Sequence, residues 1–196
     1  MPSGLVVGWR VWWVERRELC SLAREYRWKP GENAATCLAG EQVPCSLSPG
    51  RSCRCGFWAL FSPRAAMHLV SPAQDHRRAV FGLISGYGTI ALHGTEGFRA
   101  EFATIACLFP DRIGESVRLE RARRRRYVDA GETMNQLIDS STDPLKAVAD
   151  RYGVLLVPLK TALSIGLLDE LGATIEATQE VQALFTSYHQ LAFAMS

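Results

Sequence analysis

The chain has 196 residues, of which 47% are hydrophobic and 21% charged, and its formal net charge is +2. This length allows one large domain or a domain with an appendage, and the composition is that of an ordinary globular protein. The small net charge gives no indication by itself of a nucleic-acid or membrane partner, and the apolar runs fall far short of the roughly 20 residues that a membrane-spanning helix needs.

The N-terminal segment predicts a β-hairpin. Residues 7–14 alternate with a period of two, which is typical of a strand, and the charged residues 15–18 predict a turn. Residues 19–28 then return as the second strand. The segment has no basic region before its apolar residues and carries Arg10 among three tryptophans, unlike a signal peptide. We therefore expect a cytoplasmic protein, whose thiols stay reduced.

Residues 28–60 form a long segment rich in glycine, proline, serine and alanine, which favour tight turns and bury little surface. A loop of this length inside a compact domain is unusual unless something holds it. Four of the six cysteines lie here with the spacing C-x7-C-x7-C-x-C, and zinc takes four nitrogen or sulfur ligands in a tetrahedron. We therefore predict a structural Zn²⁺ site without an open catalytic position, with the ligands Cys37, Cys45, Cys53 and Cys55.

Several alternatives to this site stay open at the level of sequence. The fourth ligand could be His68, His76 or Cys20 in place of Cys45. The cysteines could instead hold an iron–sulfur cluster, although their spacing differs from the common ones. They could also be free thiols in a loop that binds no metal.

The rest of the first half predicts more strands. Residues 57–61 read as a short strand stopped by Pro63, and residues 64–78 as a connector with one turn of helix. The segment 79–108 is strongly β, with a turn at 94–97 between two antiparallel strands. Its glycines indicate strong bends or the close approach of another backbone.

Four short motifs are spread over residues 8–108: G-W-R at 8–10, W-K-P-G at 28–31, C-R-C-G-F-W-A at 53–59 and G-F-R-A-E at 97–101. With a cysteine between the second and third motifs, this order resembles a group of uncharacterised proteins from high-GC Gram-positive bacteria and their phages. A histidine often stands near the position of Cys45 in that group, which fits a metal ligand there. The resemblance implies that the cysteine loop is a built-in feature of the fold, and it brings no activity with it.

From residue 116 onward the composition changes to glutamate, arginine, alanine, leucine and glutamine, which favour helix. Glycines and a Ser-Thr-Asp-Pro segment supply the ends of four predicted helices, over 116–138, 144–152, 158–171 and 173–194. We therefore predict an α+β protein. Residues 1–112 form a β-rich domain, an antiparallel bent sheet or partial barrel with the zinc-held cysteine loop, and residues 113–196 form an α-helical C-terminal region.

Two features of the C-terminal region suggest nucleic-acid binding. Residues 145–168 resemble a helix-turn-helix of winged transcription regulators, but apolar residues 155–158 stand where polar side chains would contact phosphates and bases. A helical hairpin that packs on the domain or on a second copy explains this segment better. The basic run could bind phosphate, or it could be a solvated helix; it consists of Arg121, Arg123, Arg124, Arg125 and Arg126.

Other residues give weaker indications. His93 and Glu96 flank the predicted turn and could do acid–base work, but the sequence places no nucleophile with them. Cys107 and the tryptophans at alternate strand positions predict core residues. The favoured function is a non-enzymatic binding or adaptor protein, with another protein or a second copy as partner, engaged through the C-terminal helices. Nucleic-acid binding is the alternative, and no membrane partner is expected.

Overall fold

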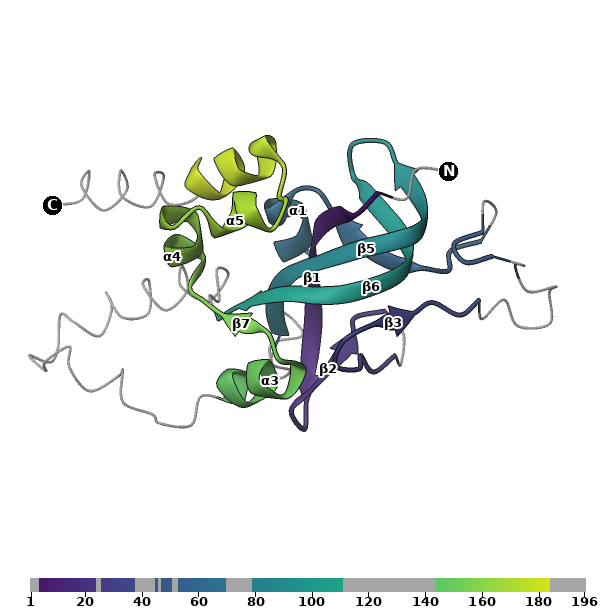
Figure 1. Cartoon of the computed structure of the whole chain (residues 1–196), viewed down its shortest axis with the longest axis horizontal. Helices are drawn as coiled ribbons and strands as arrows, with labels where there is room; N and C mark the ends of the chain where they lie inside the picture. The colour runs from purple at the N-terminus through teal and green to yellow at the C-terminus, as the bar shows by residue number, and fades with distance from the viewer. Residues whose placement is uncertain are drawn as a thin grey trace, which may run out of the picture.

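The computed structural model describes residues 4–23, 26–37, 45, 47–50, 53–69, 79–110 and 144–183. These residues form a mixed α+β fold with one bent sheet and mostly C-terminal helices, which confirms the predicted fold class (Figure 1). The strands are β1 Val6–Glu15, β2 Glu18–Ser21, β3 Asn33–Ala34, β4 Phe57–Leu60, β5 Ala79–His93, β6 Gly97–Phe109 and β7 Leu155–Leu156. The helices are α1 Pro63–Met67, α3 Pro144–Tyr152, α4 Leu159–Ser164, α5 Leu167–Glu170 and the helical residues 175–183.

The long antiparallel hairpin of β5 and β6 organises the sheet. β1 pairs along one edge of β5, while β4 and β3 pair with β6. The register of β5 against β6 shifts at two places, and Gly88 within the second has a φ of +77°. Such shifts increase twist and bend, so the predicted role of the glycines in bending this segment is confirmed here. The partial-barrel form of the sheet stays a prediction.

The predicted N-terminal hairpin is present, with a shorter second strand than expected. Its turn residues Arg16 and Arg17 have φ values of 51° and 66°, as a tight hairpin turn requires. β2 spans only four residues, and the chain then pairs back onto β2 at the bridge Cys20↔Arg27, with Trp28 N–H donating to the Leu19 carbonyl. The chain then turns around buried Asn33, whose side chain binds Lys29 N–H and carbonyl, the Gly31 carbonyl and the Tyr26 hydroxyl. This self-contained turn replaces further strand pairing.

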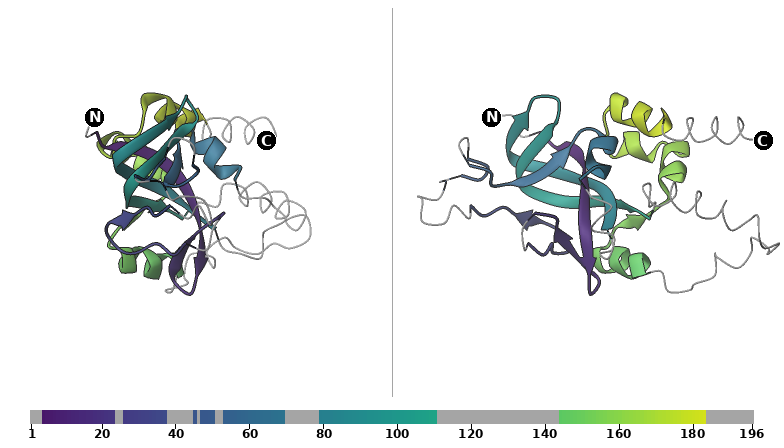
Figure 2. Two further views of the ribbon diagram at one scale, coloured as in Figure 1. Left: turned by 90° about the vertical axis from the view of Figure 1, so that its right-hand side faces the viewer. Right: turned by 180° about the vertical axis from the view of Figure 1, so that it is seen from behind.

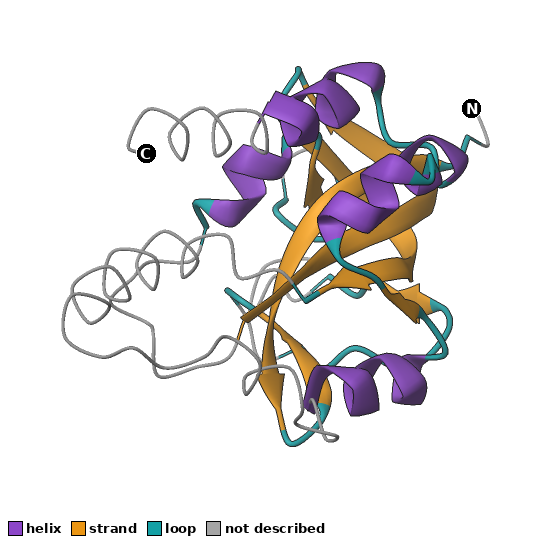
Figure 3. Ribbon diagram, turned by 90° about the vertical axis from the view of Figure 1, so that its left-hand side faces the viewer, coloured by secondary structure: helices purple, strands orange, loops and turns teal. Residues whose placement is uncertain are grey.

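The core lies on both faces of β1, because successive side chains of a strand point to opposite faces. Trp12 belongs to one cluster, which contains Val148 and Tyr152 of α3. Trp9 belongs to the other, which contains Leu159 of α4 and Leu168 of α5. Figures 2 and 3 show α3 at one end of the sheet and the later helices at the other. The predicted core role is confirmed for four buried tryptophans, Trp9, Trp12, Trp13 and Trp28.

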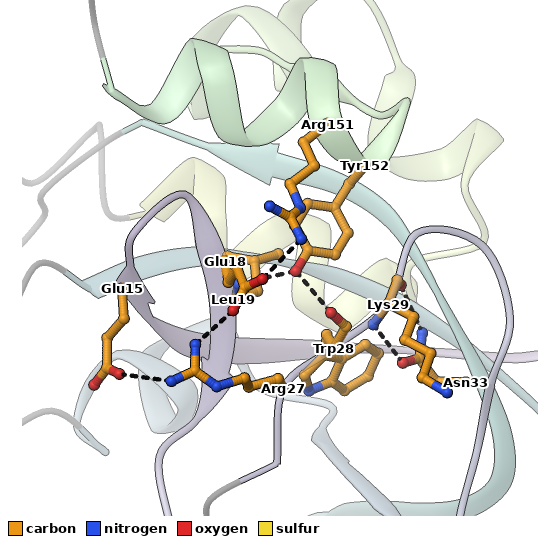
Figure 4. A network of polar contacts seen from close by, with 9 residues as sticks. All are labelled: Glu15, Glu18, Leu19, Arg27, Trp28, Lys29, Asn33, Arg151 and Tyr152. Carbon is orange, nitrogen blue, oxygen red and sulfur yellow. Dashed lines mark hydrogen bonds and ion pairs between the residues drawn. The ribbon is translucent and has the colours of Figure 1, made fainter.

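A polar network attaches α3 to the N-terminal hairpin (Figure 4). The Tyr152 hydroxyl accepts from Leu19 N–H at 3.0 Å and donates to the Trp28 carbonyl at 2.8 Å. At the rim, Glu18 pairs with Arg151 at 2.8 Å and with Arg27 at 2.5 Å. The hydrogen bond from Arg27 lowers the pKa of Glu18. The helix is therefore fixed by one buried hydroxyl and a solvated ion-pair chain.

The structure corrects both interpretations of residues 145–168, the helix-turn-helix and the helical hairpin, because a strand separates two helices that pack on different parts of the core. α3 ends at Tyr152 as predicted, followed by Gly153 with a φ of +64°. The next residues form β7, which runs parallel to the end of β6, and Val157 N–H continues the pairing by donating to the Leu108 carbonyl. Leu156 packs against the core while Leu155 is exposed, and a strand occupies the place of the turn.

Two further helix predictions are wrong in detail. Residues 158–171 form two short helices in place of one, because Gly166 has a φ of +71° that ends the first. The last helix begins at residue 175 and not at 173, with Val181 buried and Ile175 71% exposed.

Some predictions lie outside the described residues. These are the helix over 116–138 with the basic run, the boundary between residues 112 and 113, and His76. Among the described helices, none is long and apolar enough to cross a membrane.

Candidate metal centre

The fold brings the four predicted ligands together. The sulfur atoms of Cys37, Cys45, Cys53 and Cys55 all lie within 4.8 Å of one another, and those of Cys37 and Cys53 are 3.5 Å apart. An ion with four bonds of ~2.3 Å in a tetrahedron requires sulfur atoms about 3.8 Å apart. The cluster therefore has the donor set and the size of a four-thiolate metal site.

Pairing with β6 explains how distant cysteines meet. β4 pairs with residues 97–100 of β6, and β3 pairs with Phe102 and Ala103 farther along the strand. Both lie on the edge of β6 that faces away from β5, since each strand has two edges. Cys37 follows β3 and Cys55 precedes β4, so the two cysteines enter the junction between these strands from opposite directions.

The loop closes around Gly50. Its carbonyl accepts from Cys53 N–H at 3.3 Å, and its amide donates to Cys55 Sγ at 3.3 Å. A side chain at this position would place its Cβ 2.3 Å from Cys45 Sγ. Only glycine therefore lets the chain pass this close to the sulfur atom while its amide stabilises the neighbouring thiol.

The thiols differ in acidity. Burial opposes ionisation of Cys55, but hydrogen bonds from Ser48, the Gly50 amide, Cys53 and Cys45 together outweigh it and lower the pKa of this thiol to about 7. The hydrogen bond with Cys37, followed by burial, raises the pKa of Cys45 to about 12. The hydrogen bonds within the cluster therefore favour the thiolate form of Cys55 and the protonated form of Cys45.

The side chain of Arg99 binds the backbone of the cysteine loop. This side chain, at an interior position of β6, is only 4% exposed. Its Nη1 donates to the carbonyls of Cys53 and, at 3.1 Å, of Cys55. A buried guanidinium thus orients the backbone of two of the four cysteines and places a positive charge beside them.

His93 and Trp58 contact the Arg99 side chain and each other. Arg99 Nε donates to His93 Nε2 at 2.7 Å, and the imidazole stacks on Trp58 with the ring centroids 4.5 Å apart. The Trp58 indole donates to the Arg54 carbonyl within the loop and is 39% exposed, so this tryptophan departs from the predicted core role. The backbone of Glu96 closes the hairpin turn through its N–H to the His93 carbonyl. The His93 imidazole is thus engaged by Arg99 and Trp58, and the backbone of Glu96 serves the turn.

The alternative ligands that the structure describes lie elsewhere. His68 is exposed at the end of α1, and Cys20 is buried on β2. Cys107 is fully buried in the core as predicted, and burial raises its pKa to about 12. The four-sulfur group therefore includes none of His68, Cys20 and Cys107.

Sequence reasoning missed the supporting residues. In the sequence Arg99 appears only as part of the motif G-F-R-A-E, although an arginine inside an otherwise apolar strand is itself a signal of a buried polar partner. Gly50 carries no such signal, because loop glycines are common. Comparisons with protein-family models, with curated proteins and with solved structures gave no match.

Proposed function

We propose that the protein is a non-enzymatic binding or adaptor protein whose cysteine loop is held by one structural Zn²⁺ ion. The observation that carries the metal site is the convergence of four sulfur atoms within 4.8 Å in a loop joined to β3 and β4. Four thiolates fill the tetrahedral coordination of zinc and leave no position for substrate, so the ion's role is to stabilise the loop.

Electrostatics support this assignment. Four thiolates and one divalent cation carry a formal net charge of −2, which is costly in a partly buried site. Arg99 supplies a positive charge next to Cys53 and Cys55, and Gly50 supplies a hydrogen-bond donor to sulfur. Such surrounding groups orient ligands and strengthen metal binding.

For the binding role, we propose another protein or a second copy as the partner, engaged through the C-terminal helices. Exposed apolar side chains in the C-terminal region offer contact surface, namely Leu155, Ile165 and Ile175. We propose that the protein acts in the cytoplasm. A helix-turn-helix mode of DNA binding is not proposed, because β7 occupies the turn.

Metal analysis of the purified protein tests the site. We expect about one zinc per chain and no visible absorption band, since zinc has a filled d shell and iron–sulfur clusters are coloured. Cys53→Ser should lose the ion, and a chelator should lower the melting temperature of the wild type. Two control variants are analysed for zinc in the same way: Cys20→Ala, which removes a thiol outside the cluster, and His68→Ala. Both should keep one zinc per chain.

Two results would contradict the proposal. One is wild-type protein that binds no metal and melts at the same temperature with and without chelator. The other is retention of zinc in Cys53→Ser with its loss in His68→Ala, which would move the site. An iron–sulfur absorption band would show that the same cysteines hold an iron–sulfur cluster and not zinc.

A further inference from the structure

Arg10 lies where two strands meet along one edge of β1. β2 pairs with β1 from Trp12 onward, and β4 pairs with it at Trp9. Arg10 Nη2 donates to Ser21 Oγ at the end of β2 at 2.9 Å, and Nη1 donates to the Trp58 carbonyl of β4. The guanidinium therefore spans the junction between β2 and β4.

The positive charge of Arg10 has only neutral partners there. Besides the hydroxyl and the carbonyl, the guanidinium lies over the Trp28 ring, 4.9 Å from its centroid. Within the described part of the chain, no carboxylate lies at ion-pair distance from Arg10. Burial lowers its pKa to about 10, which reflects the cost of holding a charge without a counter-ion.

The same place has more hydrogen-bond donors than acceptors. Arg10 Nε and Trp12 Nε1 are buried, and neither has an acceptor among the described residues. The two residues lie two positions apart on one face of β1, and both contact the Trp28 ring. Ser21 Oγ already accepts from Arg10 and from Trp28 Nε1, so its own proton is free for another acceptor.

We propose that the β2–β4 junction binds an oxyanion group, a carboxylate or a phosphate, on Arg10. The group accepts from Arg10 Nε, with Trp12 Nε1 and the Ser21 hydroxyl as further donors, and it neutralises the guanidinium. Arginine is suited to this task because its planar fork matches the oxygens of both groups. Arg10 as a residue is half-buried but its Nε is buried, so an anion reaches Nε by displacing the side chains that cover it.

Titration of the full-length, metal-loaded protein with inorganic phosphate and with acetate tests this site. Ionic strength is held constant with sodium chloride, and the Arg10 Nε–H resonance is followed by NMR after assignment with Arg10→Lys. We expect a saturable shift of this resonance and a parallel change in tryptophan fluorescence, since Trp28 contacts the guanidinium. The anion that binds more tightly identifies the group as a phosphate or a carboxylate.

Variants separate the site from general ion effects. Arg10→Met should abolish the fluorescence change, and Arg10→Lys, which keeps the charge and lacks Nε–H, should bind at least tenfold more weakly. The exposed-arginine control Arg64→Met should respond as the wild type does. A shift that does not saturate, an equal response to chloride, or an undiminished response in Arg10→Met would mean an adventitious ion only and overturn the proposal. If Arg10→Met fails to fold, the wild-type titration and Arg10→Lys still decide.

Discussion

At the scale of single residues, the cysteine cluster depends on neighbours that are not themselves ligands. Gly50 gives its amide to Cys55 and leaves room for Cys45 Sγ, while Arg99 fixes the carbonyls of Cys53 and Cys55. The positions of the sulfur atoms are therefore set by a small residue and a buried cation. Groups that surround a metal site in this way commonly change its affinity 10–100-fold when they are altered.

Gly50→Ala should weaken metal binding by at least about tenfold. The reason is steric, because the new Cβ would lie 2.3 Å from Cys45 Sγ and force the loop apart. Competition with a colorimetric zinc chelator measures the affinity. Gly4→Ala is the matched control, since a Cβ there meets nothing within 4 Å, and it should bind zinc like the wild type. Equal affinities in the two variants would show that the loop adapts and that Gly50 is not required.

At the scale of elements, the hairpin of β5 and β6 positions the other parts. β3 and β4 share one edge of β6, which brings their adjoining cysteines together. β7 pairs with the end of β6 and leads the chain from α3 to α4. α3 is joined to the N-terminal hairpin by the Tyr152 hydroxyl, which satisfies Leu19 N–H and the Trp28 carbonyl at once.

Tyr152→Phe should lower the free energy of unfolding by about 1–3 kcal/mol, because it leaves two buried backbone groups without a partner. Chemical denaturation at constant metal loading measures the change. Tyr87→Phe serves as the comparison, since the Tyr87 hydroxyl binds exposed Glu32 and its loss should cost less than about 0.5 kcal/mol. Similar losses in both variants would contradict the special role of the Tyr152 hydroxyl.

At the scale of the whole molecule, the helices after residue 143 and the sheet share their core. Val148 and Tyr152 lie in the cluster of Trp12, and Leu159 and Leu168 lie in the cluster of Trp9. Burying each large apolar side chain contributes roughly 1.5–3 kcal/mol, and a domain is stable by only about 5–15 kcal/mol. The free energy gained by burying the side chains of these helices is therefore as large as the whole free energy of unfolding.

A fragment of residues 1–112 tests whether the predicted boundary separates independent domains. We expect it to lose cooperative unfolding and to bind a hydrophobic dye, because both faces of its sheet lose their covering helices. Circular dichroism during heating and dye fluorescence measure these properties against the full chain. A cooperative transition with well-dispersed NMR signals from the fragment would instead support the β-rich domain as an independent unit.

The sequence by itself determined the features with a local physical signal. Period-two alternation identified β1. Gly153 marked the end of α3, and the glycines of residues 79–108 indicated the bends of the β5–β6 hairpin. Four thiols in a turn-rich loop indicated a metal site. Each of these follows from properties of residues close together in the chain. The prediction of a single helix over 158–171 failed because one glycine outweighed the helical pattern around it.

Only the tertiary structure decided the features that depend on pairing between distant segments. β7 formed where two leucines met the end of β6, and Arg99 came to support residues 53 and 55 because β4 lies beside β6. Arg10 likewise acquired its position from the junction of β2 and β4. A strand edge accepts any segment that reaches it in register, and no local pattern specifies which one will do so.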